Sequence, residues 1–167
     1  MVLCLDLGNS RLKYALFEGS QLRDSGFIAD LSLELAQQKT KNHPHTTALA
    51  LDIFNAEARA AAIQQVDLVI SMLPAHLHIE VAKDCITYKK HLVTASYISD
   101  AMQALDHEAK ANNLVFMNEI GLDPGIDHMS AMKVIDEIRE QGGKMLLFES
   151  FCGGLVAPES DTNLWNY

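Results

Sequence analysis

Paired cysteines, basic clusters and long apolar runs are all absent from this 167-residue chain. Its three cysteines, Cys4, Cys85 and Cys152, lie far apart, a spacing that argues against a zinc or iron–sulfur site and favours a reducing, cytoplasmic setting. With 13 basic against 22 acidic residues and a net charge of −9, we expect neither a nucleic-acid nor a membrane partner. An acid at Asp6 interrupts the apolar N-terminus, so we expect no signal peptide and no membrane span.

A glycine-rich turn is missing from the first 29 residues, which contain only isolated glycines. Dinucleotide-binding domains open with a strand and a G-x-G-x-x-G turn, whose backbone amides hold a pyrophosphate. Here residues 11–17 alternate between apolar and polar, and Glu18-Gly19-Ser20 is typical of a turn. We therefore expect an atypical β-hairpin segment over residues 1–28, in place of the usual first strand, glycine-rich turn and helix.

The rest of the chain alternates between short strands and helices. Residues 68–70 and 92–93 are apolar runs too short for helices, whereas residues 75–88 between them repeat apolar positions at helical intervals. Two strands joined by such a helix lie parallel, with a right-handed crossover. The repeated alternation predicts an α/β fold with a doubly wound, Rossmann-like parallel sheet. The expected strands are 47–51, 68–70, 92–93, 114–117 and 144–151, and the expected helices are 32–42, 56–64, 75–88, 100–112 and 126–141.

Small and hydroxylic residues gather where the strands of this sheet end. The sequences Ser-Met-Leu-Pro-Ala at 71–75 and Thr-Ala-Ser-Tyr at 94–97 follow two strands, and such sheets bind ligands at their carboxyl edge. Asp30 and Asp52 end the two preceding strands. A carboxylate at Asp30 can bind the ribose hydroxyls of a dinucleotide and repel a 2′-phosphate, which slightly favours NAD over NADP. A helix cap at Asp30 and a turn acid at Asp52 are the alternative interpretations.

The segment NEIGLDPGIDH, which ends at His128, concentrates polar and turn-forming residues before a long helix. Its glycines let the backbone approach a ligand closely. Asp123, Asp127 and His128 have the chemistry to bind a substrate amine or move a proton, but caps and turns use the same residue types, and both interpretations stay open. His76 and His78 would point in different directions on a helix, so we expect no metal site there.

Four motifs, DLVISMLPAHLH, HLVTASYISDAM, NEIGLDPGIDH and FCGGLVAPES, follow one another between Asp30 and Tyr167. In these motifs the chain resembles the glutamate-forming saccharopine dehydrogenases. The resemblance implies an NAD(P)-binding domain over residues 29–167, truncated at the start of a substrate domain. It also implies NAD(P)-dependent hydride transfer at the CH–NH bond of saccharopine, in lysine metabolism, and leaves a homodimer open. Without the glycine-rich turn, we expect this chain to be weak or inactive as a catalyst.

The resemblance also assigns residues to a site, with NAD or NADP as the cofactor and no metal. Asp123 would hold the substrate amine and is the catalytic candidate. Cofactor contacts would fall on Asp30, Leu31, Ser32, Asp52, Ile53, Leu73, Pro74, Ala95 and Ser96. Substrate contacts would fall on Ser96, Tyr97, Leu122 and Asp123, with Cys152 as a further candidate.

The first 28 residues have a likeness of their own. The sequence LCLDLGNSRLKYALFEG is similar to the opening hairpin of type III pantothenate kinases, in which D-x-G-N-[ST] places an acid near magnesium. That resemblance would give roles to Asp6, Gly8, Asn9, Ser10 and Lys13. An ATP-dependent kinase fragment and a non-catalytic dinucleotide-binding fragment are therefore the alternative functions. We interpret residues 25–29 as a join between the two likenesses, arising from a natural fusion or from an artefact.

Overall fold

The chain falls into two compact units, Met1–Gly125 and Ile126–Tyr167. A computed structural model describes residues 1–6, 17–18, 21–22, 25–41 and 43–151 of it. All six strands of the main sheet and all but one of the helices described below lie in the first unit. The candidate site is therefore built within the first unit.

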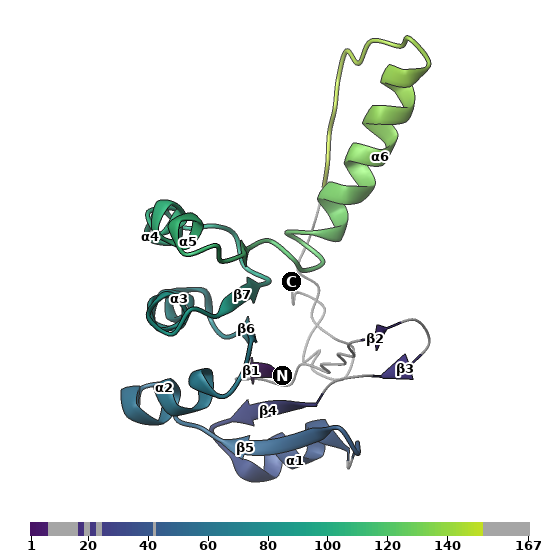
Figure 1. Cartoon of the computed structure of the whole chain (residues 1–167). Coiled ribbons are helices and arrows are strands. Elements are labelled where there is room, and N and C mark those ends of the chain that lie inside the picture. The colour runs from purple at the N-terminus through teal and green to yellow at the C-terminus, as the bar shows by residue number, and fades with distance from the viewer. Residues whose placement is uncertain (7–16, 19–20, 23–24, 42, 152–167) are drawn as a thin grey trace, which may run out of the picture. The chain divides into compact units, whose positions relative to one another are not determined.

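Six strands form one sheet in the order β5-β4-β1-β6-β7-β8, and every neighbouring pair is parallel (Figure 1). The chain first moves outward from β1 to β4 and β5, and then returns to the other side of β1 with β6, β7 and β8. This reversal confirms the predicted doubly wound sheet. The strands are β1 (Val2–Asp6), β4 (Gly26–Asp30), β5 (Thr46–Ala50), β6 (Leu68–Met72), β7 (His91–Thr94) and β8 (Phe116–Met117).

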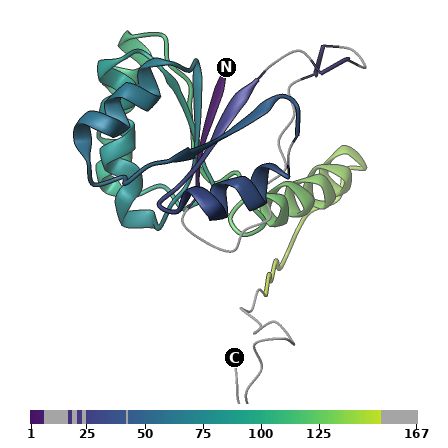
Figure 2. The same ribbon diagram turned by 90° about the horizontal axis from the view of Figure 1, so that it is seen from below.

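Helices cover both faces of this sheet (Figure 2). Helix α1 packs against β4 and β5, while α2, α3 and α4 pack against one another in sequence on the opposite face. Instead of the single helix expected over 100–112, the chain forms two short helices that are separated near Ala104. The helices of this unit are α1 (Leu33–Thr40), α2 (Ala56–Gln64), the 3₁₀ turn η1 (Ala75–Leu77), α3 (His78–Thr87), α4 (Asp100–Gln103) and α5 (Asp106–Ala111).

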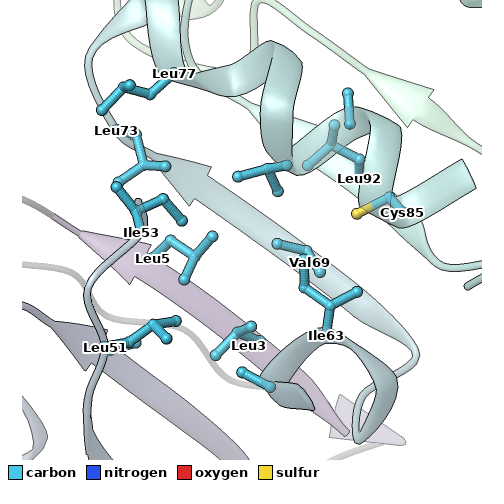
Figure 3. Packing of buried hydrophobic residues seen from close by; sticks show 14 of the residues in the cluster. Leu3, Leu5, Leu51, Ile53, Ile63, Val69, Leu73, Leu77, Cys85 and Leu92 are labelled. Atoms are coloured by element: carbon cyan, nitrogen blue, oxygen red, sulfur yellow. The ribbon is translucent and has the colours of Figure 1, made fainter. Parts of the chain in front are cut away.

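The main hydrophobic core lies between the sheet and the α2–α3 layer (Figure 3). Because side chains alternate along a strand, Leu3 and Leu5 of β1 point to the same face, where they join Val69 and Leu92. Ile63 of α2 packs onto them and is fully buried. The core also takes in buried residues from the segments that follow β5 and β6, the last of them in η1: Leu51, Ile53, Leu73 and Leu77. Apolar packing in the core therefore holds these segments in place.

The N-terminus differs from the expectation, because a first strand is present. Val2–Asp6 forms β1 at the centre of the sheet, with Leu3 opposite both Phe27 of β4 and Val69 of β6. A separate hairpin pairs β2 (Phe17–Glu18) with β3 (Gln21–Leu22). The expectation that a hairpin replaces the first strand was wrong because partners far along the chain decide where a five-residue strand pairs. Residues 7–16, where a glycine-rich turn would stand, lie outside the described residues.

The second unit contains α6 (Ile126–Glu140), and Gly142 follows it with a φ of 76°, as expected of a glycine that closes a helix. The strand expected at 144–151 is wrong, since these residues have no regular structure. Alternation of apolar residues predicts a strand only where another strand can pair with it, and Leu146 and Phe151 are instead almost fully exposed. In the described part of the chain, no helix is long and apolar enough to cross a membrane.

Candidate functional site

The carboxyl ends of β4, β5, β6 and β7 form one edge of the sheet, because neighbouring strands are parallel. This edge includes the place where the strand order reverses at β1, at which doubly wound sheets bind their ligands. The structure brings every expected cofactor residue to it: Asp30, Leu31 and Ser32 after β4, Asp52 and Ile53 after β5, Leu73 and Pro74 after β6, and Ala95 and Ser96 after β7.

Asp30 ends β4, and its carboxylate is already engaged. One oxygen accepts a hydrogen bond from the Ser32 amide at 3.0 Å, and the other accepts one from Lys39 Nζ at 2.8 Å. The side chain is only 4% exposed. Burial by itself would raise the pKa of Asp30, but the hydrogen bonds from Lys39 and Ser32 outweigh it, so this pKa lies below its usual value. Asp30 is therefore a buried, ionised carboxylate that accepts hydrogen bonds from two donors, Lys39 and the Ser32 amide.

The apolar residues at this edge separate into two kinds. Ile53 and Leu73 are buried in the hydrophobic core, so they support the loops after β5 and β6 from within. Leu31 and Phe54 are exposed, and a planar ring or ribose can lie only against side chains of this kind. Asp52 accepts a hydrogen bond from the Phe54 amide at 2.9 Å and so shapes the loop that carries the phenyl ring of Phe54. Phe54 was not among the predicted site residues.

A buried histidine connects the tips of β6 and β7. His78 Nδ1 lies 2.8 Å from Ser71 Oγ, and its Nε2 lies 2.8 Å from Ser96 Oγ. Burial, and to a lesser degree the nearby His76, lowers the pKa of His78, so the ring is neutral at pH 7. A neutral imidazole donates from one nitrogen and accepts at the other. One of the two serine hydroxyls therefore donates to the ring, and the other accepts from it.

The first residues of the NEIGLDPGIDH segment, 118–121, lie beside β7. Ile120 donates its amide to the Thr94 carbonyl, and Glu119 donates its amide to the Ser96 carbonyl, both at 3.1 Å. The Glu119 carboxylate in turn accepts from the Ile98 amide at 3.1 Å. Gly121 follows, with Ala95 so close that an added Cβ would lie 3.2 Å from the Ala95 carbonyl oxygen. These contacts fix the segment against the loop after β7.

This docking brings the expected substrate residues together. Tyr97 Oη donates to an Asp123 carboxylate oxygen at 2.6 Å. Both side chains are accessible, with Tyr97 61% exposed, and Leu122 next to Asp123 is 73% exposed. A carboxylate held by a phenol can still accept a proton or an N–H from a ligand, since it has several lone pairs. Tyr97 and Asp123 thus form a polar corner that can receive an amine.

The remaining candidates are not residues of the first unit that the structure describes. Asp127 and His128, which are 2.8 Å apart, belong to the second unit, and Cys152 lies outside the described residues. Sequence reasoning also missed Lys39 and His78. His78 could have been found, because it shares the helical spacing of the buried Val81 and Cys85, and a polar residue on such a face needs partners. Across residues 1–151, wherever the structure describes them, no three potential metal ligands gather.

Two family models match the chain. The one described as "Saccharopine dehydrogenase NADP binding domain" matches residues 20–117, which include the tips of β4 to β7. The one described as "Saccharopine dehydrogenase C-terminal domain" matches residues 121–167. The boundary between the two matches lies within the NEIGLDPGIDH segment, close to the boundary between the two structural units.

Comparisons with individual proteins agree with the two family models. A saccharopine dehydrogenase [NADP(+), L-glutamate-forming] from Pyricularia oryzae is 46% identical over 87% of this chain and 33% of its own length. An alpha-aminoadipic semialdehyde synthase from Arabidopsis thaliana is 43% identical over 81% of the chain and 13% of its own length. The apo structure of the L-Glu-forming saccharopine dehydrogenase from Saccharomyces cerevisiae aligns with a TM-score of 0.77 and 36% identity, over 97% of this chain and 36% of that one. The chain thus spans about a third of the length of these fungal proteins.

Proposed function

Because the chain belongs to the saccharopine dehydrogenase family, we propose that the carboxyl edge of its six-stranded sheet binds a nicotinamide dinucleotide for the oxidation or formation of saccharopine. The observation that carries the proposal is the gathering of the strand tips after β4, β5, β6 and β7 at the reversal of strand order, within the part matched by the NADP-binding-domain model. The activity itself belongs to the relatives, and this chain spans only about a third of the length of the fungal ones.

NADP is the dinucleotide that we propose. The family description and the fungal relatives name NADP, and they give no support to the slight preference for NAD that Asp30 suggested. The cofactor contacts would come from Asp30, Leu31, Ser32, Asp52, Ile53, Leu73, Pro74, Ala95 and Ser96, the buried members acting by shaping the loops. When bound, the nicotinamide supplies the hydride chemistry, and the protein positions the reacting groups.

We propose that the substrate amine binds at the Tyr97–Asp123 corner. Asp123 would accept a hydrogen bond from the secondary amine of saccharopine, and Tyr97 would keep the carboxylate turned toward it. Ser96 and Leu122 would complete the contacts on either side. The hydrogen bonds from Ser71 through His78 to Ser96 would hold the Ser96 hydroxyl in one orientation. Each nitrogen of the neutral His78 ring is either a donor or an acceptor, so the Ser96 hydroxyl can only accept from the ring or only donate to it.

Other expectations from the sequence stay predictions. These include the homodimer, the cytoplasmic location and the saccharopine dehydrogenase-type domain over residues 29–167. Since β1 belongs to the same sheet as β4, we propose that this domain also includes residues 2–6. The kinase-like motif of the first 28 residues lies mostly outside the described residues, and the resemblance to pantothenate kinases is likewise a prediction.

Replacing Ala75 with tryptophan is expected to block dinucleotide binding. Ala75 is exposed and directly follows Pro74 at the carboxyl edge, so an indole there would occupy the proposed site. We expect the Kd for NADPH, measured by isothermal titration calorimetry on the full chain, to rise about tenfold or more, equivalent to about 1.4 kcal/mol or more.

Ala61→Trp is the matched control, since Ala61 is exposed on α2, away from the tip of β6. This variant should keep the wild-type Kd. Equal weakening by both variants, or an absence of wild-type binding at about 1 mM NADPH, would overturn the proposed function.

A further inference from the structure

A buried ion pair lies behind the proposed ribose end of the site. Lys39 Nζ and Asp30 Oδ2 are 2.8 Å apart, and the two side chains are only 11% and 4% exposed. Asp30 is the last residue of β4, whereas Lys39 lies in the last turn of α1 and reaches back along that helix. Lysine is rarely buried to this extent unless it is paired, because its charge must be taken out of water.

Because Asp30 ends β4 at the proposed site, this ion pair bears on the choice between NAD and NADP. An acid at the end of this strand normally binds the ribose hydroxyls of NAD and repels the 2′-phosphate of NADP. Here the two carboxylate oxygens already accept hydrogen bonds from Lys39 and from the Ser32 amide. The lysine cancels the negative charge of Asp30, so the acid cannot act as an unpaired anion toward a phosphate.

We propose that Lys39 is the residue that makes this edge accept the 2′-phosphate of NADP, by neutralising the negative charge of Asp30 beside the ribose. This inference rests on the proposed function and extends it to one end of the cofactor. It accounts for an acidic strand tip in a chain matched by a NADP-binding-domain model. The pair acts through charge, and a neutral residue at position 39 would restore the ordinary repulsion by Asp30.

The test is a pair of calorimetric titrations, with NADPH and with NADH, on the full chain. The wild type should prefer NADPH. Lys39→Met should raise the ratio of the NADPH Kd to the NADH Kd about tenfold or more, because the unpaired charge of Asp30 would repel the 2′-phosphate, which only NADPH carries. Lys39→Arg should restore the wild-type ratio. Lys41→Met, an exposed site just beyond the same helix, should leave the ratio unchanged.

A second variant covers the case in which Lys39→Met fails to fold. Asp30→Asn leaves Lys39 positive and removes the acid, so it should shift the ratio toward NADPH. Equal weakening of both dinucleotides by Lys39→Met, or an unchanged ratio in Asp30→Asn, would overturn the role of Lys39 while leaving the proposed function intact. A wild type that binds neither dinucleotide would overturn both.

Discussion

Replacing Arg59 with methionine should lower the free energy of unfolding by about 3–5 kcal/mol, because it breaks a buried charged network by removing one partner. Arg59 on α2 is 7% exposed. Its Nε donates to Asp84 of α3 at 2.6 Å, and its guanidinium also donates to the Ile53 carbonyl. Methionine keeps much of the volume of arginine but supplies no donor, so the Asp84 carboxylate and the Ile53 carbonyl each lose a hydrogen bond.

Equilibrium urea unfolding followed by circular dichroism would measure this loss. Arg139→Met is the matched control, since the Arg139 side chain is 66% exposed and its contact with Asp136 is at 3.6 Å, so we expect a change below about 0.5 kcal/mol. A double variant, Arg59→Met with Asp84→Leu, should recover part of the stability, because the unpaired acid is removed as well. A loss in Arg59→Met no greater than that of the control would show that the network is not formed.

Replacing Leu3 with alanine should cost about 2–5 kcal/mol of stability, the range for a fully buried leucine whose cavity cannot collapse. Leu3 is 0% exposed at the centre of β1 and joins the core between the sheet and the α2–α3 layer. Leu35→Ala removes the same atoms from a side chain that is 43% exposed on α1, and should cost much less. The same urea titration measures both.

The difference between Leu3→Ala and Leu35→Ala tests the central position of β1, which the sequence did not predict. If β1 were a loosely attached segment, Leu3→Ala and Leu35→Ala would have similar effects. A large difference between them is what a central strand requires, because Leu3 can be buried only when β1 pairs with both β4 and β6.

The elements that sequence reasoning placed well were those defined by local chemistry. Residues 56–64 form α2 with the predicted bounds, because Asn55 caps the helix and accepts a hydrogen bond from the Ala58 amide. The central position of Val2–Asp6 was missed, since it depends on pairing with strands about 25 and 65 residues further along the chain. The strand expected at 144–151 failed for the same reason: no local pattern shows whether a partner strand exists.

The candidate site follows the same division. The sequence could predict that the tips after β6 and β7 share one edge, because parallel strands joined by a helix must end together. It could not show that Asp123 meets Tyr97, which follows from the docking of residues 118–121 beside β7. Nor could it show that Lys39 reaches Asp30, because a lysine nine residues away is ordinarily read as a solvent-exposed side chain.

Hydrogen–deuterium exchange with and without saturating NADPH, read by mass spectrometry on the full chain, would test whether a dinucleotide binds at the carboxyl edge of the sheet. Exchange reports local opening of the backbone, so a bound ligand slows it where the ligand lies. We expect slower exchange in peptides that cover the strand tips at 30–32, 52–55, 73–75 and 95–97, and no change at the opposite edge in residues 65–67 and 89–90. Unchanged exchange at these tips, or slowing confined to the opposite edge, would contradict a dinucleotide site at the carboxyl edge of the sheet.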